Sequence, residues 1–313
     1  MTTPTRTFNL TRNQIITRAF NVLNVFEPNE SISADDINLG ADFLNMMVKH
    51  WAAHGIHLFQ KETGYLFFQY NQNKYLVDGS TAFATTSYIQ TTQKTMVSSG
   101  TTVVITSTAG MAANDNIGFV LDSGTIFWTT INTVSNSTNL ILNASIPSSV
   151  TAGNQVYDIG PTLIDKPLKV HYAFRRDTLT NTDTPMATLS NSDYYNLPVK
   201  GSLGTPLEFY YDCQVSNGDL LVWPTPNSVT TIMGFTYDKR INDLNFSTDT
   251  PDFPNEWLMS LVYNLAVYLA PIYGKYIELN YVQPLAKALL EEVKSFDQEE
   301  ANIVLKPSSR NKL

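Results

Sequence analysis

The stretch IGFVLDSGTIFWTTI, residues 117–131, determines how the middle of this chain folds. Apolar and β-branched residues lie on both sides of Asp122-Ser123-Gly124, a turn sequence of the kind that joins two antiparallel strands. We therefore predict one strand over 116–121 and a second over 125–134, paired as a β-hairpin.

The segment around this hairpin differs in composition from both of its flanks. Residues 91–159 almost lack Lys, Arg and Glu and are rich in Thr, Ser, Asn and Val, which favours strands with uncharged polar surfaces. Short strands at regular spacing predict a small β-barrel or sandwich. We assign residues 91–160 to such a module, inserted in the chain, with further strands at 102–107, 139–142 and 155–159.

Two more β-regions flank this module. In residues 63–90, apolar residues alternate with polar ones on both sides of Asn71-Gln72-Asn73, which predicts a second hairpin. Residues 161–250 form a further β-region in which Asn217-Gly218 predicts a hairpin turn. Its expected strands are 169–175, 207–214, 219–223 and 231–237, with a loop or short helix near 192–197.

Both ends of the chain have the 3.6-residue periodicity of helices. Thr11 with Gln14, and Ser33 with Asp36, have the spacing of N-terminal helix caps. A proline, Pro284, lies within the last periodic stretch and predicts a kink there. The expected helices are 11–26, 33–55, 254–269 and 275–302.

The predicted fold class is therefore α+β. The N-terminal helices, residues 1–62, and the C-terminal helices, residues 251–303, are expected to form one helical domain. The β-rich middle, which contains the inserted module, joins them, and residues 304–313 form an extended tail.

Charge and composition exclude several classes of function. The net charge of −8 with a pI near 5.0 provides no basic field for sequence-specific nucleic-acid binding, so DNA is expected to be met only non-specifically. Cys213 is the only cysteine, which excludes an intrachain disulfide; we expect it to be buried. The longest apolar stretch, 258–272, is shorter than the about 20 residues of a membrane span, so no membrane is expected as a partner.

The motifs of catalysis and metal binding are mostly missing. His50 and His54 have the i, i+4 spacing of two zinc ligands, but Trp51 stands where a metalloprotease needs a glutamate. The sequence contains neither a phosphate-binding glycine loop nor a nucleophile elbow. We predict that the protein is not an enzyme and has no catalytic residues, metal or cofactor.

The ends of the chain together resemble a known family, the head-to-tail adaptors of short-tailed bacteriophages, also called tail accessory or packaged-DNA stabilisation proteins. The resemblance lies in the order of several stretches along the chain. They are IITRAFNVLNVF, DDINLGADFLNMMVKHWAAHGIHLF, Trp223-Pro224-Thr225-Pro226 and FPNEWLMSLVYNLAVYLAPIYG, while IGFVLDSGTIFWTTI looks like the β-module of longer members.

The resemblance implies a structural role in the tail or neck of a virion assembled in the host bacterial cytoplasm. Copies would bind beneath the portal protein as a ring, expected to be a homo-dodecamer, extend the DNA channel and provide a platform for tail components. The expected partners are the portal, other copies of the chain, and a tail hub, nozzle or fibres, the last group held by the outward β-module.

The family also implies where these contacts lie. Portal docking is assigned to the tail, residues Val304, Leu305, Lys306, Pro307, Arg310, Lys312 and Leu313, whose basic side chains suit an acidic groove. Trp51 and Trp257 are expected to pack helices together, or to mark helix surfaces that form the ring interface.

Two other functions remain open at this stage. Strands rich in Thr, Ser and Asn, with many tyrosines, also suit a receptor-binding or carbohydrate-binding virion protein. Glu208, Asp212 and Asp219 could supply the paired carboxylates of a polysaccharide or cell-wall hydrolase. Selective binding on a glycan array would favour the first function, and polymer turnover lost in Glu208→Gln would favour the second.

Overall fold

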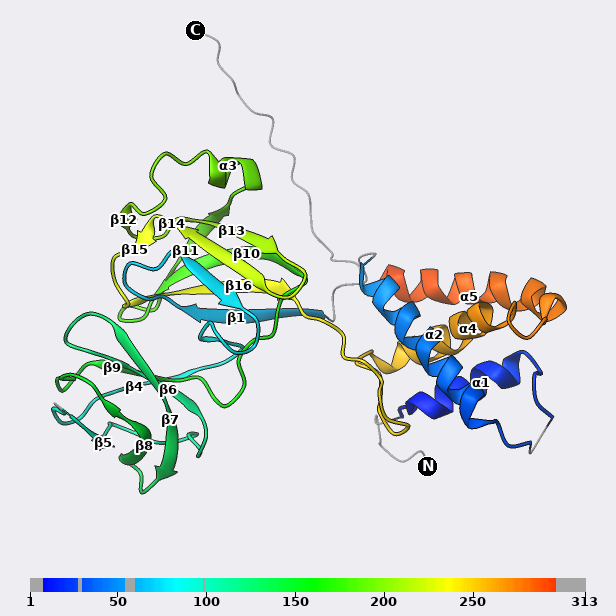
Figure 1. The fold of residues 1–313 in the computed structure, drawn as a ribbon, viewed down its shortest axis with the longest axis horizontal. Helices are drawn as coiled ribbons and strands as arrows, with labels where there is room; N and C mark the ends of the chain where they lie inside the picture. The colour runs from blue at the N-terminus through cyan, green and yellow to red at the C-terminus, as the bar shows by residue number, and fades with distance from the viewer. Residues whose placement is uncertain (1–7, 28–29, 54–59, 98, 297–313) are drawn as a thin grey trace, which may run out of the picture. The chain divides into compact units, whose positions relative to one another are not determined.

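The computed structural model describes residues 8–27, 30–53, 60–97 and 99–296, and the chain divides into two compact units (Figure 1). One is the continuous segment Lys61–Arg240. The other combines the described residues up to Gln60 with those from Ile241 onward. Each unit has its own packing and its own surface features.

The second of these, which we call the helical unit, is organised around α4. Its elements are α1 (Arg12–Val22), α2 (Ala34–Ala53), the short 3₁₀ helix η2 (Asn255–Trp257), α4 (Leu258–Leu269) and α5 (Tyr276–Phe296). α4 packs against α1, α2 and α5, because its apolar residues recur at helical spacing and lie buried on more than one side.

The helix starts follow the predicted caps. The Thr11 side chain accepts a hydrogen bond from the Gln14 backbone, and the Gln14 side chain accepts one from the Thr11 backbone. Before α2, the Ser33 hydroxyl accepts a hydrogen bond from the Asp36 backbone N–H at 3.1 Å and donates one to the Asp36 carboxylate at 2.6 Å. Both capping predictions are confirmed, and each cap satisfies backbone N–H groups that a helix end leaves without a partner.

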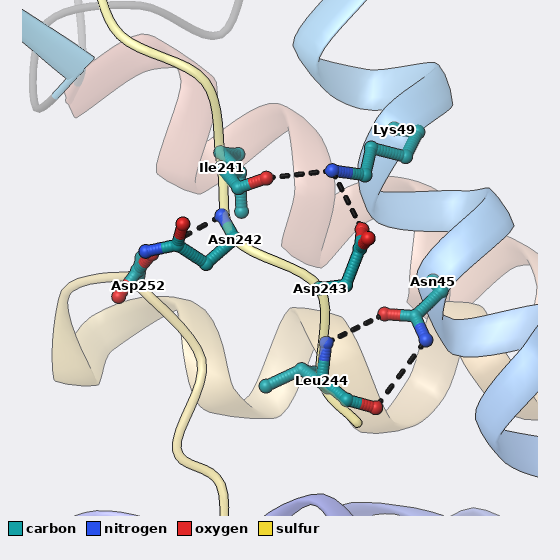
Figure 2. Close-up of polar contacts among 7 residues, drawn as sticks. All are labelled: Asn45, Lys49, Ile241, Asn242, Asp243, Leu244 and Asp252. Atoms are coloured by element: carbon teal, nitrogen blue, oxygen red, sulfur yellow. Dashed lines mark hydrogen bonds and ion pairs between the residues drawn. The ribbon is translucent and has the colours of Figure 1, made fainter. Parts of the chain in front are cut away.

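The chain re-enters the helical unit through residues 241–252, which have no helical structure and are bound to α2 (Figure 2). The Asn45 amide accepts from the Leu244 N–H at 3.0 Å and donates to the Leu244 carbonyl at 3.3 Å. Lys49 donates to the Ile241 carbonyl at 2.6 Å and forms an ion pair with Asp243 at 2.7 Å. Side chains of α2 thus satisfy backbone N–H and carbonyl groups of this segment, as a neighbouring strand would do in a sheet.

The first unit, which we call the β unit, contains an eight-stranded sheet. The strand order is β2-β14-β13-β11-β10-β16-β1-β3, antiparallel except between β11 and β13. One continuous core includes residues from both ends of the sheet. The strands are β1 (Lys61–Phe67), β2 (Lys74–Val77), β3 (Ala84–Thr85), β10 (Lys169–Asp177), β11 (Thr182–Thr188), β13 (Glu208–Cys213), β14 (Gly218–Trp223) and β16 (Thr231–Asp238).

A second sheet of six strands closes into a barrel. Its order is β4-β9-β6-β7-β8-β5, and the bridge between Gln93 and Ile105 joins the segments that continue its two outer strands. Its strands are β4 (Ile89–Thr92), β5 (Gly100–Val104), β6 (Asn116–Val120), β7 (Ile126–Val134), β8 (Asn139–Ile146) and β9 (Gln155–Asp158). β12 (Leu203–Gly204), β15 (Thr225–Pro226) and α3 (Asn191–Tyr195) complete the β unit.

The barrel and the eight-stranded sheet share a hydrophobic core. Phe67 of β1 lies 4.9 Å from Tyr157 of β9 and 5.3 Å from Trp128 of β7, measured between ring centroids. Ile126, Ile159, Val229 and Ile232 complete the buried part of this cluster. Because the two sheets bury side chains against each other, they form one unit.

The predicted fold class was wrong. More of the described residues lie in strands than in helices, and the β part is one large unit, Lys61–Arg240, instead of a β-rich middle with a small inserted module. The ends do not form a domain of helices alone either, because the non-helical residues 241–252 are bound within the same unit. The low charge of 91–159 reflects the surface of those strands and does not mark a boundary in the core.

Two further predictions about the β-structure need correction. β1 and β2, expected to pair as a hairpin, do not pair: β1 lies between β16 and β3, and β2 pairs with β14. Cys213, expected to be buried, is exposed at the end of β13. The hairpins at Asp122-Ser123-Gly124 and Asn217-Gly218 are confirmed, as is the short helix near 192–197.

Candidate interaction surfaces

Trp51 and Trp257 lie in the interior of the helical unit. They are 5% and 4% exposed, and their rings lie 6.1 Å apart. Phe253 contacts both rings, at 6.4 Å from Trp51 and 5.6 Å from Trp257. These aromatic side chains join the end of α2 to the start of α4, a position suited to helix packing.

The last helix carries an exposed apolar row. Val282 and Ala286 are buried on the inner side of α5, and the Ala286 carbonyl accepts a hydrogen bond from Asn264 of α4 at 3.1 Å. Ile277, Tyr281 and Leu285 follow one another at four-residue spacing and are 74%, 78% and 42% exposed. Residues at this spacing share one side of a helix, so α5 presents a continuous row to which another protein could bind.

The same unit contains an apolar groove between the N-terminal segment, α1 and the start of α4. Its volume is about 610 Å³. Phe8 and Met259 are 66% and 52% exposed at this groove. Its other apolar lining residues are Leu10, Val22, Leu258, Val262 and Tyr263. α4 lies between α1 and α5 in Figure 1 and packs against both. The groove is lined by residues of α1 and α4, whereas the apolar row belongs to α5, and the two share no residue.

Polar contacts fix the turn from which the apolar row starts. Tyr273 donates to Asp36 at 2.5 Å, and Lys275 donates to the Asn24 carbonyl at 2.6 Å. The hydrogen bonds from Ser33 and Tyr273 lower the pKa of Asp36, because they stabilise its ionised form. The start of α2 and the end of α1 therefore hold the connection between α4 and α5.

The candidate hydrolase acids are not arranged as a catalytic pair. Glu208 and Asp212 lie four residues apart on β13, about 13 Å at the rise of a strand, which exceeds the about 5–9.5 Å between glycosidase carboxyl groups. Asp212 faces Asp219 across β13 and β14, but Asp219 is ion-paired with Lys74 at 2.6 Å. The Asp212 carboxylate in turn accepts a hydrogen bond from the Gln214 side chain at 2.6 Å. Both carboxylates are therefore bound to other side chains, and the geometry does not favour hydrolysis.

Other predicted positions cannot be placed. His54 and the whole tail from Val304 to Leu313 lie outside the described residues. Among the residues that are described, no group of three or more His, Cys, Asp or Glu side chains could hold a metal ion. Within the same residues, no helix is both long and apolar enough to cross a bilayer.

A protein-family model described as SU10 adaptor protein matches residues 128–302, which is more than half of the 313 residues. The chain belongs to the SU10 adaptor protein family. A search of curated proteins gives no match. Membership makes this SU10 adaptor a structural phage protein of the virion, which interacts with other head or tail proteins.

The family model matches only part of the chain. It starts in β7 and includes the second half of the barrel, the strands from β10 to β16, and the helices α4 and α5. α1 and α2, which contributed to the resemblance seen in the sequence, precede the match. The apolar row lies within it, whereas the groove is built partly from residues before it.

Proposed function

We propose that this SU10 adaptor is the head-to-tail adaptor of a short-tailed phage. Copies bind beneath the portal as a ring, extend the DNA channel and provide a platform for tail components. The observation that carries this proposal is that one helical unit exposes two different apolar surfaces, the row on α5 and the groove beside α1 and α4.

Two different surfaces on one chain are what a ring requires. A contact that uses unlike patches on neighbouring copies passes from copy to copy and closes when the rotation permits. We place the row Ile277, Tyr281 and Leu285 of one copy in the groove of the next. Each large apolar side chain that becomes buried contributes about 1.5–3 kcal/mol. An interface of only a few such side chains is weak, so copies are expected to associate when the portal holds them side by side and not when they are free in solution.

The charge of the chain fits a channel through which DNA passes. A net charge of −8 opposes retention of the phosphate backbone, whereas a basic lining would bind it through counterion release. Contact with passing DNA is therefore non-specific and brief.

Portal docking is assigned to the tail, residues 304–313. Lys306, Arg310 and Lys312 place three positive charges there without an acidic residue, in a chain that is acidic as a whole. Such a segment suits an acidic groove on a partner, where charge complementarity speeds and orients association.

The ring interface is tested with Tyr281→Glu, which places a charge in the middle of the apolar row. Mixed with purified portal and viewed by electron microscopy, the unaltered chain is expected to decorate the portal as a ring, and Tyr281→Glu is not. Gln283→Glu is the matched control, because it adds the same charge at an exposed polar position of α5. Ring formation by Tyr281→Glu would contradict the assigned interface.

The tail is tested by deleting residues 304–313. The truncated chain is expected to keep its circular dichroism spectrum and melting temperature and to lose portal binding in a pull-down. Unchanged binding would refute docking through the tail. Failure of the full-length chain to bind any portal would refute the proposed function itself.

A further inference from the structure

The β unit contains a polar cleft where the barrel meets the eight-stranded sheet. Its volume is about 720 Å³, within the about 300–1,000 Å³ of small-molecule sites. Side chains of β1, β4, β9, β10, the β3–β4 connection and the β10–β11 turn line it. They are Tyr65, Thr86, Ser87, Tyr88, Gln90, Thr91, Thr92, Gln155, Arg176, Thr178, Leu179 and Asn181.

The cleft is electrically neutral. Arg176 is the only charged residue of its lining, and its guanidinium binds Asp183 through two hydrogen bonds of 2.7 Å. Such a bidentate pair neutralises the charge and holds the guanidinium in one orientation. Arg176 also lies 5.6 Å from the centre of the Tyr65 ring. The cleft therefore has no unpaired charge with which to select an ion.

Two glutamines supply a matched donor and acceptor. The Gln90 side chain donates to the Gln155 Oε1 and to the Thr178 carbonyl, both at 2.8 Å. These bonds occupy the amide hydrogens of Gln90 and leave its Oε1 to accept, while Gln155 keeps its Nε2 to donate. A hydroxyl both donates and accepts, so neighbouring hydroxyls of one ligand fit this pair.

Aromatic and hydroxyl groups complete the lining. Tyr88 stands perpendicular to Tyr65, with ring centroids 5.1 Å apart and an interplanar angle of 74°. Apolar faces of a ligand can pack against such rings. Ser87, Thr91 and Asn181 add uncharged polar groups. The combination of rings with hydroxyls and amides suits a molecule with apolar C–H faces and many hydroxyls.

The cleft is also held in shape before any ligand arrives. The Thr178 side chain donates to the Thr230 carbonyl at 2.8 Å and lies 2.9 Å from the Tyr157 hydroxyl of the barrel. Asp177 accepts from the Leu179 N–H at 2.8 Å, which fixes the β10–β11 turn. A preformed site avoids the entropic cost of ordering its walls when a ligand binds.

We propose that this cleft is a binding site for a neutral saccharide. The site contacts ring C–H faces through Tyr88 and vicinal hydroxyls through Gln90 and Gln155. It binds without cleaving, and it lies in the β unit, apart from the apolar surfaces assigned to ring assembly.

The test titrates the full-length chain with maltotriose, cellotriose, mannotriose and N,N′,N″-triacetylchitotriose, by saturation-transfer NMR and calorimetry. At least one is expected to bind. Ser87→Trp, which fills the cleft from an exposed position, and Gln90→Ala are each expected to weaken binding at least about tenfold, the effect of losing one good polar contact or more. Thermal melting shows whether each variant is folded.

Matched controls are Gln214→Ala and Tyr172→Ala, both exposed residues of the β unit outside the cleft, which should bind as the unaltered chain does. Binding of none of the four sugars overturns the proposal. So does binding that folded Ser87→Trp leaves unchanged, or binding of sialyllactose in preference to every neutral sugar. None of these results bears on portal binding.

Discussion

At the scale of single residues, burial changes the chemistry of one carboxylate of the barrel, that of Asp158. Asp158 and Asp115 are 2% and 5% exposed. Asp158 accepts a hydrogen bond from the Gly160 N–H at 3.1 Å, and Asp115 accepts one from the Ala112 N–H at 2.6 Å. Burial, with a smaller contribution from the charge of Asp115, raises the pKa of Asp158 to about 6.

This pKa predicts the direction of a pH effect on stability. The ordinary Asp pKa is 3.8, so between about pH 4 and pH 6 the folded state holds a proton that the unfolded state releases. The contribution of Asp158 therefore stabilises the folded state as the pH falls through about 6 and is complete near pH 4. It amounts to about 3 kcal/mol at most.

Asp158→Asn removes this titration. We expect the variant to melt at a higher temperature than the unaltered chain at pH 8, and the difference to shrink by pH 5. Circular dichroism melting at both values measures it. Other carboxylates act in the opposite direction: Asp78, Asp122 and Asp183 have lowered pKa values, and their contribution to the stability of the folded state is lost when the pH falls further. Comparing the unaltered chain with the variant at each pH separates the effect of Asp158 from theirs. A difference that grows on acidification would contradict the prediction.

At the scale of elements, local signals and long-range pairing behave differently. Caps and tight turns involve residues within about four positions of one another, so Thr11 with Gln14 and Asp122-Ser123-Gly124 were readable from sequence. The pairing of β1 with β16 joins residues 61–67 to 232–238. The alternation of apolar and polar residues within β1 does not indicate which strand it pairs with. This is why the expected hairpin of β1 with β2 was wrong.

The segment 241–252 gives a prediction at the same scale. Asn45→Ala leaves the part-buried Leu244 N–H without its side-chain acceptor, and leaves the Leu244 carbonyl with only the 3.5 Å hydrogen bond from Arg12. We expect the free energy of unfolding of the helical unit to fall by about 1–3 kcal/mol, measured by denaturant titration. Lys49→Ala should cost less, because its ion pair with Asp243 is about half exposed and the Ile241 carbonyl is the one backbone group that loses a hydrogen bond from Lys49. An equal or larger loss for Lys49→Ala would contradict this assignment.

At the scale of the whole molecule, the chain consists of two units with separate cores. We expect calorimetry to show two thermal transitions, because cooperative unfolding follows a continuous core. Asn45→Ala should lower only one of them. Gly234→Ala should lower only the other, because a Cβ at Gly234 would overlap the Phe174 ring on the neighbouring strand. One transition that both variants shift would show that the units unfold together.

The sequence by itself determined the helix caps, the two hairpins and the resemblance to phage adaptors, and it left a loop or a short helix open where α3 lies. All of these depend on short motifs or on their order along the chain. It placed Trp51 and Trp257 on helices, but their contact with each other required the packing of α2 against α4.

Only the tertiary structure decided the fold class and the candidate surfaces. The barrel joins the eight-stranded sheet because Phe67, Trp128 and Tyr157, distant in sequence, bury one another. The polar cleft exists because Gln90, Gln155 and Arg176 come from three separate strands. Periodicity in the sequence shows which residues share one side of a helix or strand. Which other element packs against that side depends on the rest of the chain.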